Sequence, residues 1–186
     1  MRFVVCSLWT PEFETFGPQT ESNKRRYAEK HGYRFTCDRS VRSERPPAWS
    51  KLPIVWSEFG WSDWVFWLDA DAAVSNPDIR LESLIDADAD LILAADANGL
   101  NTGSVLFRSC GAVLDLLRSA WSAEHLIHHP WWEQAAIVEA LAGSSVRVKV
   151  DRRMQSCLEN WQPNDFVFHA PSRSLEERTW LLSAFF

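Results

Sequence analysis

The chain has 186 residues, 46% of them hydrophobic, which suits one domain with a substantial core and excludes an intrinsically disordered protein. The net charge of −6 excludes the basic surface that nucleic-acid binding requires, and no run approaches the roughly 20 apolar residues of a membrane span. The one dense basic run, Lys24-Arg25-Arg26, is interpreted as a solvated helix face, and the four separated cysteines favour a reducing, cytoplasmic setting, with two disulfides left open.

The hydrophobic pattern predicts strands and helices that alternate along the first part of the chain. Strands are expected at residues 2–8, 33–37, 63–68, 90–95, 104–108, 146–150 and 166–168. Helices are expected at residues 20–31, 49–59, 111–124 and 132–142, the first of them ending at Gly32. This order predicts an α/β fold with a mostly parallel central sheet flanked by helices. Because no linker or internal repeat interrupts the pattern, residues 1–186 are expected to form a single domain.

The strongest strand signal, residues 63–68, is apolar on both faces and runs directly into Asp69 and Asp71. Two carboxylates one residue apart repel each other, so a positive charge is expected beside them. A divalent cation would supply that charge, because hard cations prefer oxygen ligands. The alternative is a solvated strand end, since Asp is common in turns.

His169 ends the last predicted strand, residues 166–168, in the same way. A lone His is usually a structural residue, but here it accompanies a pair of acidic residues at strand ends. Imidazole suits Mn²⁺ better than Mg²⁺, so His169 is predicted to be a third metal ligand. Thr10 and Asp96 also fall at strand ends, and the carboxyl ends of strands are where open α/β sheets bind ligands.

Asp96 begins a polar segment that also contains Asn98, Asn101 and Gly103 and that lies between two predicted strands. Its carboxylate and amide groups could bind sugar hydroxyls, although Asn and Gly also form plain turns. Further along, Glu133 and Gln134 open a predicted helix, where an acidic residue is also explained by the helix dipole.

Six sequence blocks occur together in a characteristic order. They are Asn23-Lys24-x-x-Tyr27-Ala28-x-x-His31-Gly32-Tyr33, Pro47-Ala48-Trp49-Ser50-Lys51-Leu52, Trp67-Leu68-Asp69-Ala70-Asp71-Ala72, Asn101-Thr102-Gly103-Ser104, Glu133-Gln134 and Asp165-Phe166-Val167-Phe168-His169. The set resembles the galactosyl/xylosyl/mannosyltransferase family of xyloglucan xylosyltransferases, galactomannan galactosyltransferases and Golgi mannan mannosyltransferases. The resemblance covers roughly residues 1–170.

The resemblance implies a GT-A fold, a nucleotide-diphosphate sugar as donor (UDP preferred), a saccharide acceptor and retention of configuration. It implies Mn²⁺, with Mg²⁺ as the alternative, held by Asp69, Asp71 and His169. Donor contacts are expected by the resemblance from Lys51, Asp69, Asn98, Asn101 and Gly103. They are also expected from Ser7, Trp9 and Thr10, by their position at the end of the first predicted strand, and from Arg173, a basic residue that could contact a phosphate where the chain departs from the family pattern. Gln134 is expected beside the anomeric carbon, together with Glu133 and Asp96. Because Gln is a poor nucleophile, a front-face substitution is expected.

The chain departs from the family pattern near its C-terminal block, where Asn164 replaces a Gly and Pro171 and Ser172 follow Ala170. An inactive or weakly active nucleotide-sugar-binding relative is therefore one alternative. A phosphatase of the haloacid dehalogenase type is another, although that motif requires Thr or Val where this chain has Ala73. The sugar, the acceptor and the oligomeric state are not determined by the sequence.

Overall fold

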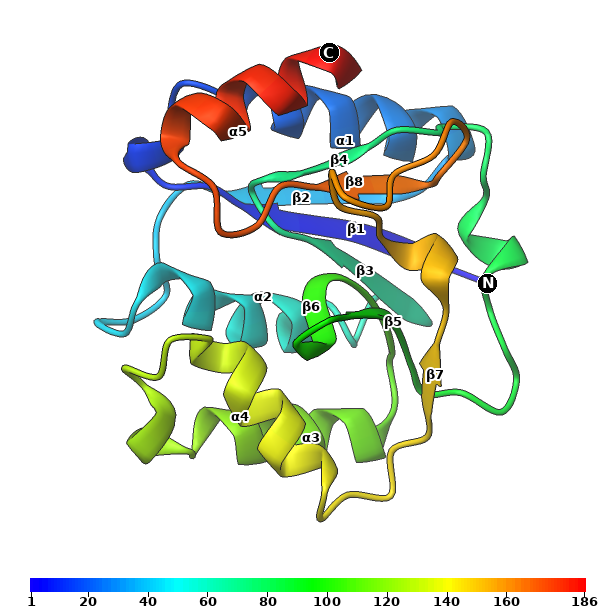
Figure 1. Ribbon diagram of the computed structural model, residues 1–186. Coiled ribbons are helices and arrows are strands. Elements are labelled where there is room, and N and C mark those ends of the chain that lie inside the picture. Colours follow the sequence, from blue (N-terminus) through cyan, green and yellow to red (C-terminus); the bar gives the residue numbers. More distant parts are fainter.

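The computed structural model describes residues 1–186 and builds a six-stranded sheet of order β2-β1-β3-β6-β5-β7 (Figure 1). These strands are β1 (Phe3–Leu8), β2 (Arg34–Asp38), β3 (Trp64–Leu68), β5 (Leu91–Asp96), β6 (Gly99–Arg108) and β7 (Val148–Val150). Only β6 is antiparallel to its neighbours, so the other five strands run in one direction. The expected mostly parallel sheet is confirmed.

Helices cover both faces of this sheet (Figure 1). On one face lie α2 (Lys51–Ser57), α3 (Gly111–Trp121) and α4 (Trp132–Leu141). On the other face lie α1 (Gly17–His31), α5 (Leu175–Leu182) and a two-stranded sheet of β4 (Ala72–Val74) and β8 (Val167–His169). Short 3-10 turns occur at Pro11–Phe13, Pro47–Ser50, Leu81–Ser83, Glu124–Leu126, Arg152–Met154 and Ser183–Phe185. No helix combines the length and apolar character that crossing a membrane requires.

The core follows from the period-two alternation of the central strands. Along β1, Val4 and Cys6 pack into the apolar cluster beneath α2, α3 and α4. Phe3 and Val5 point the other way and pack with Tyr27 of α1. Both clusters are buried, so β1 and β3 read as nearly continuous apolar runs in the sequence, as central parallel strands do.

The structure differs from the sequence expectations in several elements. Strand β6 begins at Gly99 rather than at residue 104, because the chain turns tightly after Asp96 and re-enters the sheet at once. Strand β4 was not predicted, since three residues are too few to show a period. Helix α5 was also not predicted, although Ser174 and Glu177 form a capping box at its start.

Candidate active site

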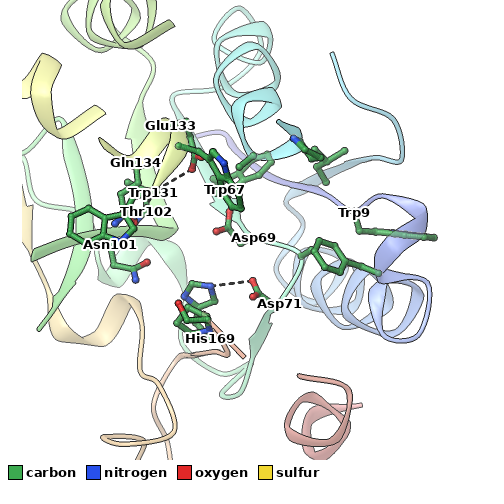
Figure 2. A pocket seen from close by; sticks show the side chains of 18 of the residues that line it. Trp9, Trp67, Asp69, Asp71, Asn101, Thr102, Trp131, Glu133, Gln134 and His169 are labelled. Atoms are coloured by element: carbon green, nitrogen blue, oxygen red, sulfur yellow. Dashed lines mark hydrogen bonds and ion pairs between the residues drawn. The ribbon is translucent and has the colours of Figure 1, made fainter. Parts of the chain in front are cut away.

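The carboxyl ends of β1, β3 and β5 meet the beginning of β6 at one edge of the sheet, because β6 alone runs the opposite way. A cavity of about 410 Å³ opens at this edge. Figure 2 shows Trp9 on one side of the cavity, Trp131 and Gln134 on the other, and Asp69 and Asp71 between them. The edge is therefore where the chemistry-bearing residues of the sequence converge.

Asp69, Asp71 and His169 each offer a ligand atom, and these atoms all lie within 4.8 Å of one another. Strand β4 pairs with β8 so that His169 lies opposite Ala72. This pairing brings Nε2 of the His169 imidazole to 3.1 Å from Asp71 Oδ1. The Nδ1 atom of the same ring is buried and has no hydrogen-bond partner. Two carboxylates and an imidazole form a donor set that Mn²⁺ accepts, so these residues fit a divalent cation.

The imidazole of His169 lies directly over Gly103 of β6. A Cβ atom built on Gly103 would lie 2.2 Å from the Cε1 atom of His169, which no side chain can accommodate. The carbonyl oxygen of Gly103 also accepts a hydrogen bond from the Asp69 amide at 2.8 Å. Gly103 therefore makes room for a ring of the cluster rather than contacting the cavity itself.

Asp71 is compensated on its other side by α5, which was not predicted. The Arg178 guanidinium Nε lies 3.3 Å from Asp71 Oδ2, and Arg178 lines the cavity. Burial alone would raise the pKa of Asp71, but His169 and Arg178 outweigh it and hold that pKa below its usual range. Arg173, the basic residue expected at the phosphates, pairs instead with Glu159 and is absent from the cavity lining.

Lys51 forms the buried support of Asp69. Its ammonium lies 3.1 Å from Asp69 Oδ1 and 2.6 Å from Glu133 Oε1, and donates to the Thr102 carbonyl at 2.9 Å. Burial lowers the pKa of Lys51, but the two carboxylates outweigh that effect and raise it, so the ammonium stays charged. Only 1% of the Lys51 side chain is exposed, and Lys51 does not line the cavity, so it can influence a ligand there through Asp69 but not by direct contact.

Lys24 is a second buried ammonium beneath the site, and the sequence interpretation of it as a solvated residue is wrong. It is 1% exposed and donates hydrogen bonds to the Asp69 carbonyl at 2.6 Å and to Ser7 Oγ at 2.9 Å. Burial lowers its pKa to about 8. Ser7 Oγ in turn donates a hydrogen bond to the Leu68 carbonyl. Ser7 was expected to contact the sugar donor, but its side chain faces Lys24 and the strand ends and does not line the cavity. The Asn23-Lys24 motif could have indicated that Lys24 belongs to the site. The basic run Lys24-Arg25-Arg26 led instead to its interpretation as a solvated helix face.

The opposite end of the cavity is built by β5, β6 and the start of α4. Asp96 accepts hydrogen bonds from the Asn98 amide at 2.7 Å and from Asn101 Nδ2 at 2.8 Å. The backbone N–H of Thr102 donates to Gln134 Oε1 at 3.0 Å, which fixes the orientation of that side-chain amide. Asp96, Asn98, Asn101 and Gln134 all line the cavity, so the structure brings together the residues expected at the sugar.

Trp9 and Thr10 line the far end, as expected from their place after β1. The Trp9 indole donates to Glu21 at 2.8 Å, and the Arg39 guanidinium lies 5.0 Å from the ring centroid. Gly17 leaves the space for this ring, since a Cβ there would approach it to 2.6 Å. A fixed aromatic face at this end could stack against a flat base.

Comparison with known proteins gives this site a context. A sequence profile described as the galactosyl transferase GMA12/MNN10 family matches residues 10–91. A protein of Schizosaccharomyces pombe named as an uncharacterized alpha-1,2-galactosyltransferase is 29% identical over 129 residues, 47% of this chain and 34% of that protein. A Saccharomyces cerevisiae protein named "Probable alpha-1,6-mannosyltransferase" is 26% identical over 148 residues, 60% of this chain and 35% of that protein. The chain thus spans about a third of the length of these relatives.

Solved structures agree on the fold. A glycosyltransferase involved in glycosylation of the major capsid of PBCV-1 superposes with a TM-score of 0.82 at 20% identity, covering 99% of this chain and 100% of that one. A galactosyltransferase in complex with donor and acceptor sugar analogs gives a TM-score of 0.63 at 14% identity, covering 97% and 95% of the two chains. These likenesses establish the GT-A fold.

Proposed function

We propose that this chain, as a member of a family of GT-A glycosyltransferases, transfers a hexose or pentose from a UDP-sugar to a saccharide acceptor with retention of configuration. The observation that carries this proposal is the convergence of Asp69, Asp71 and His169 with Gln134 around one cavity. A non-catalytic sugar-binding module would need the aromatic walls of this cavity but not that set.

The donor's orientation follows from the chemistry of the cavity ends. Trp9 and Thr10 would hold the base, and the acidic cluster, formed by Asp69, Asp71 and His169, would lie under the diphosphate. The amide and carboxylate groups of Asp96, Asn98 and Asn101 would receive the sugar hydroxyls. Arg178 is the cavity's cation, and we propose that it contacts a donor phosphate in place of Arg173.

A divalent cation bound by Asp69, Asp71 and His169 would neutralise charge on the leaving diphosphate. Mn²⁺ is favoured over Mg²⁺ because one of the three ligands is an imidazole. The protein's own contribution is to place a positive charge beside each carboxylate: Lys51 lies 3.1 Å from Asp69, and Arg178 lies 3.3 Å from Asp71.

The same geometry favours a front-face substitution. Glu133 is a poor nucleophile here because its carboxylate is 5% exposed and paired with Lys51. Gln134 Oε1 accepts a hydrogen bond from the Thr102 backbone N–H at 3.0 Å and a long one from the Thr102 hydroxyl at 3.5 Å. Because that hydroxyl can donate to Glu133 Oε1 at 3.4 Å instead, one lone pair of Gln134 Oε1 could stabilise positive charge at the anomeric carbon. The acceptor hydroxyl would then attack from the side on which the diphosphate leaves, which retains the configuration.

Thermal unfolding of the purified protein with UDP, GDP and their common sugar conjugates, each with Mn²⁺ and with EDTA, tests the donor assignment. A ligand that binds the folded state raises the melting temperature by mass action, so UDP should do so only with Mn²⁺. Asp71→Ala should remove the Mn²⁺-dependent shift while leaving a folded protein. An unchanged UDP affinity of Asp71→Ala in Mn²⁺ would refute the metal assignment.

Gln134→Ala tests the catalytic role separately from binding. We expect turnover of the donor to fall by about 10²-fold, because a group that acts on developing charge contributes mainly in the transition state. The affinity for Mn²⁺-UDP should change little. Equal losses in turnover and in donor affinity would assign Gln134 to binding alone.

A further inference from the structure

A second cavity of about 320 Å³ lies beside the donor cavity, and the donor assignment leaves it unused. Asn98, Trp131 and Gln134 line both cavities. The second cavity is otherwise formed by the turn between β5 and β6, the segment around Leu126 and the outer surface of α4, including Val138. A ligand held there would meet a donor sugar at the Gln134 amide.

The lining of the second cavity has the chemistry of a site for a neutral sugar. Five of its ten residues are hydrophobic, and the polar ones include the amides of Asn98 and Gln134, the imidazole of His129 and the carboxylate of Glu139. A pyranose ring presents an apolar face and a rim of hydroxyls, which such a mixture suits. None of the ten is Lys or Arg, so the cavity offers no cation to a phosphorylated ligand.

Trp131 supplies a flat face at the boundary between the two cavities. Its side chain remains 48% exposed, although burial would be favourable for so large an apolar ring. Its backbone N–H donates to His129 Nδ1 at 3.1 Å, and the two rings pack edge to face with centroids 5.7 Å apart. The indole is therefore positioned before any ligand binds, and Figure 2 shows it beside Asn101 and Gln134.

The backbone next to Trp131 is strained. Trp132, the first residue of α4, has a φ of 40°, a region that a residue with a bulky side chain rarely enters. The strained turn is held by hydrogen bonds from the Trp132 amide to the His129 carbonyl and from the Gln134 amide to the Trp131 carbonyl, both 2.9 Å. Such strain concentrates at functional sites, and the residues at this turn, Trp131, Trp132 and Gln134, all line the donor cavity.

We propose that the second cavity is the acceptor subsite and that it holds a neutral saccharide stacked on the Trp131 indole. This inference rests on the proposed glycosyl transfer. In the transfer step, the acceptor hydroxyl oxygen bonds to the anomeric carbon as the bond from that carbon to the diphosphate oxygen breaks. The hydroxyl proton passes to the departing diphosphate, so charge and atoms balance.

The test measures nucleotide release from the UDP-sugar that the protein turns over, with and without methyl glycosides of galactose, glucose, mannose and xylose. Val138→Trp fills the second cavity from an exposed position of α4 that does not line the donor cavity. We expect it to raise the KM for the stimulating saccharide by about tenfold or more, with the KM for the donor changed less than about twofold. Val148→Trp, at a similarly exposed valine of β7 outside both cavities, is the matched control and should match the unmodified protein.

Trp131→Ala is the second variant, with Trp61→Ala at an exposed Trp outside both cavities as its control. Loss of the indole should raise the KM for the saccharide, while the Mn²⁺-dependent thermal shift by UDP persists. The inference is overturned if both variants keep the saccharide KM, or if no methyl glycoside stimulates nucleotide release by the unmodified protein. A protein that neither binds UDP with Mn²⁺ nor releases nucleotide would instead refute the proposed function, and the inference with it.

Discussion

At the scale of single residues, the acidic cluster depends on neighbours that are not themselves ligands. Asp69 is held by the ammonium groups of Lys51, at its carboxylate, and of Lys24, at its carbonyl. The Trp67 indole also donates to Asp69 Oδ1 at 2.5 Å. Because these partners are buried, the carboxylate is fixed before any ligand binds, and in the proposed transfer the site would not have to reorganise.

Gly103→Ala should disable the cluster. The added methyl group would collide with the His169 ring, so either the ring or strand β6 must move. We expect a loss of stability of about 1–3 kcal/mol from overpacking, and loss of the Mn²⁺-dependent thermal shift by UDP. Gly111→Ala is the control, since nothing lies within 4 Å of a Cβ there. Retention of the manganese-dependent shift in Gly103→Ala would show that His169 is not a ligand.

Lys51→Met should destabilise the fold more than loss of an ordinary ion pair. It leaves the Glu133 carboxylate buried without its counter-ion, which typically costs about 3–5 kcal/mol. Lys30→Met, which removes an exposed pair with Asp78, should lower the stability far less. Urea unfolding of both variants measures the difference, and the double variant Lys51→Met, Glu133→Leu should recover part of the loss. Equal losses in the two single variants would contradict a buried supporting role.

At the scale of elements, α5 and the small β4–β8 sheet close the site from one side. Helix α5 places Arg178 against Asp71, and β8 places His169 against the same carboxylate. Leu181 and Leu182 of α5 pack into an apolar cluster with Trp9 and Phe168, so the buried face of the helix holds it against the end of the cavity at Trp9 and against the strand that carries His169.

Ser174→Ala should loosen the start of α5. The Ser174 hydroxyl accepts a hydrogen bond from the Glu177 amide, and Glu177 accepts one in return from the Ser174 amide. Loss of this capping box is expected to cost about 1 kcal/mol in urea unfolding and to increase amide hydrogen exchange in the first turn of α5. Ser145→Ala, at an exposed loop residue, is the control. Unchanged exchange in α5 would show that the buried face alone fixes its first turn.

At the scale of the whole molecule, one acidic residue, Asp90, connects three segments at the edge of the sheet opposite the cavity. Asp90 pairs with Arg147, Nε to Oδ2 at 2.9 Å, and with Arg108, at 3.3 Å. Hydrogen bonds from Arg147 are the main cause that lowers the pKa of Asp90 from 3.8 to about 2. The contacts join the start of β5 to the end of β6 and to the segment that enters β7.

The stability that Asp90 contributes should therefore depend on pH. Its folded pKa lies below its unfolded pKa, so the contribution is complete above about pH 4 and is lost as the pH falls toward about 2. The full shift corresponds to about 2 kcal/mol, reduced by the half-exposed Arg147, and about half should remain at pH 3. Urea unfolding of the unmodified protein and of Asp90→Asn at pH 7 and pH 3 checks this. A stability difference between the two proteins that is equal at both pH values would contradict it.

The sequence alone determined the fold class and the positions of the acidic residues. Apolar runs such as residues 63–68 are long enough to identify central strands, and polar residues placed directly after them must emerge at the carboxyl edge of the sheet. Asp69, Asp71, Asp96 and His169 could be predicted as neighbours for that reason, before any contact between them was known.

Only the tertiary structure decided which positive charges compensate the carboxylates of Asp69 and Asp71. Lys24 and Lys51 lie in segments whose local pattern is that of ordinary helices, and their burial depends on how α1 and α2 dock against the strands. Arg178 faces the cavity because Leu181 and Leu182 pack into the apolar cluster and thereby fix the rotation of α5, whereas Arg173 precedes the helix and pairs with Glu159. Local patterns determine where a strand ends, but the partner of a buried charge is set by contacts between segments far apart in the chain.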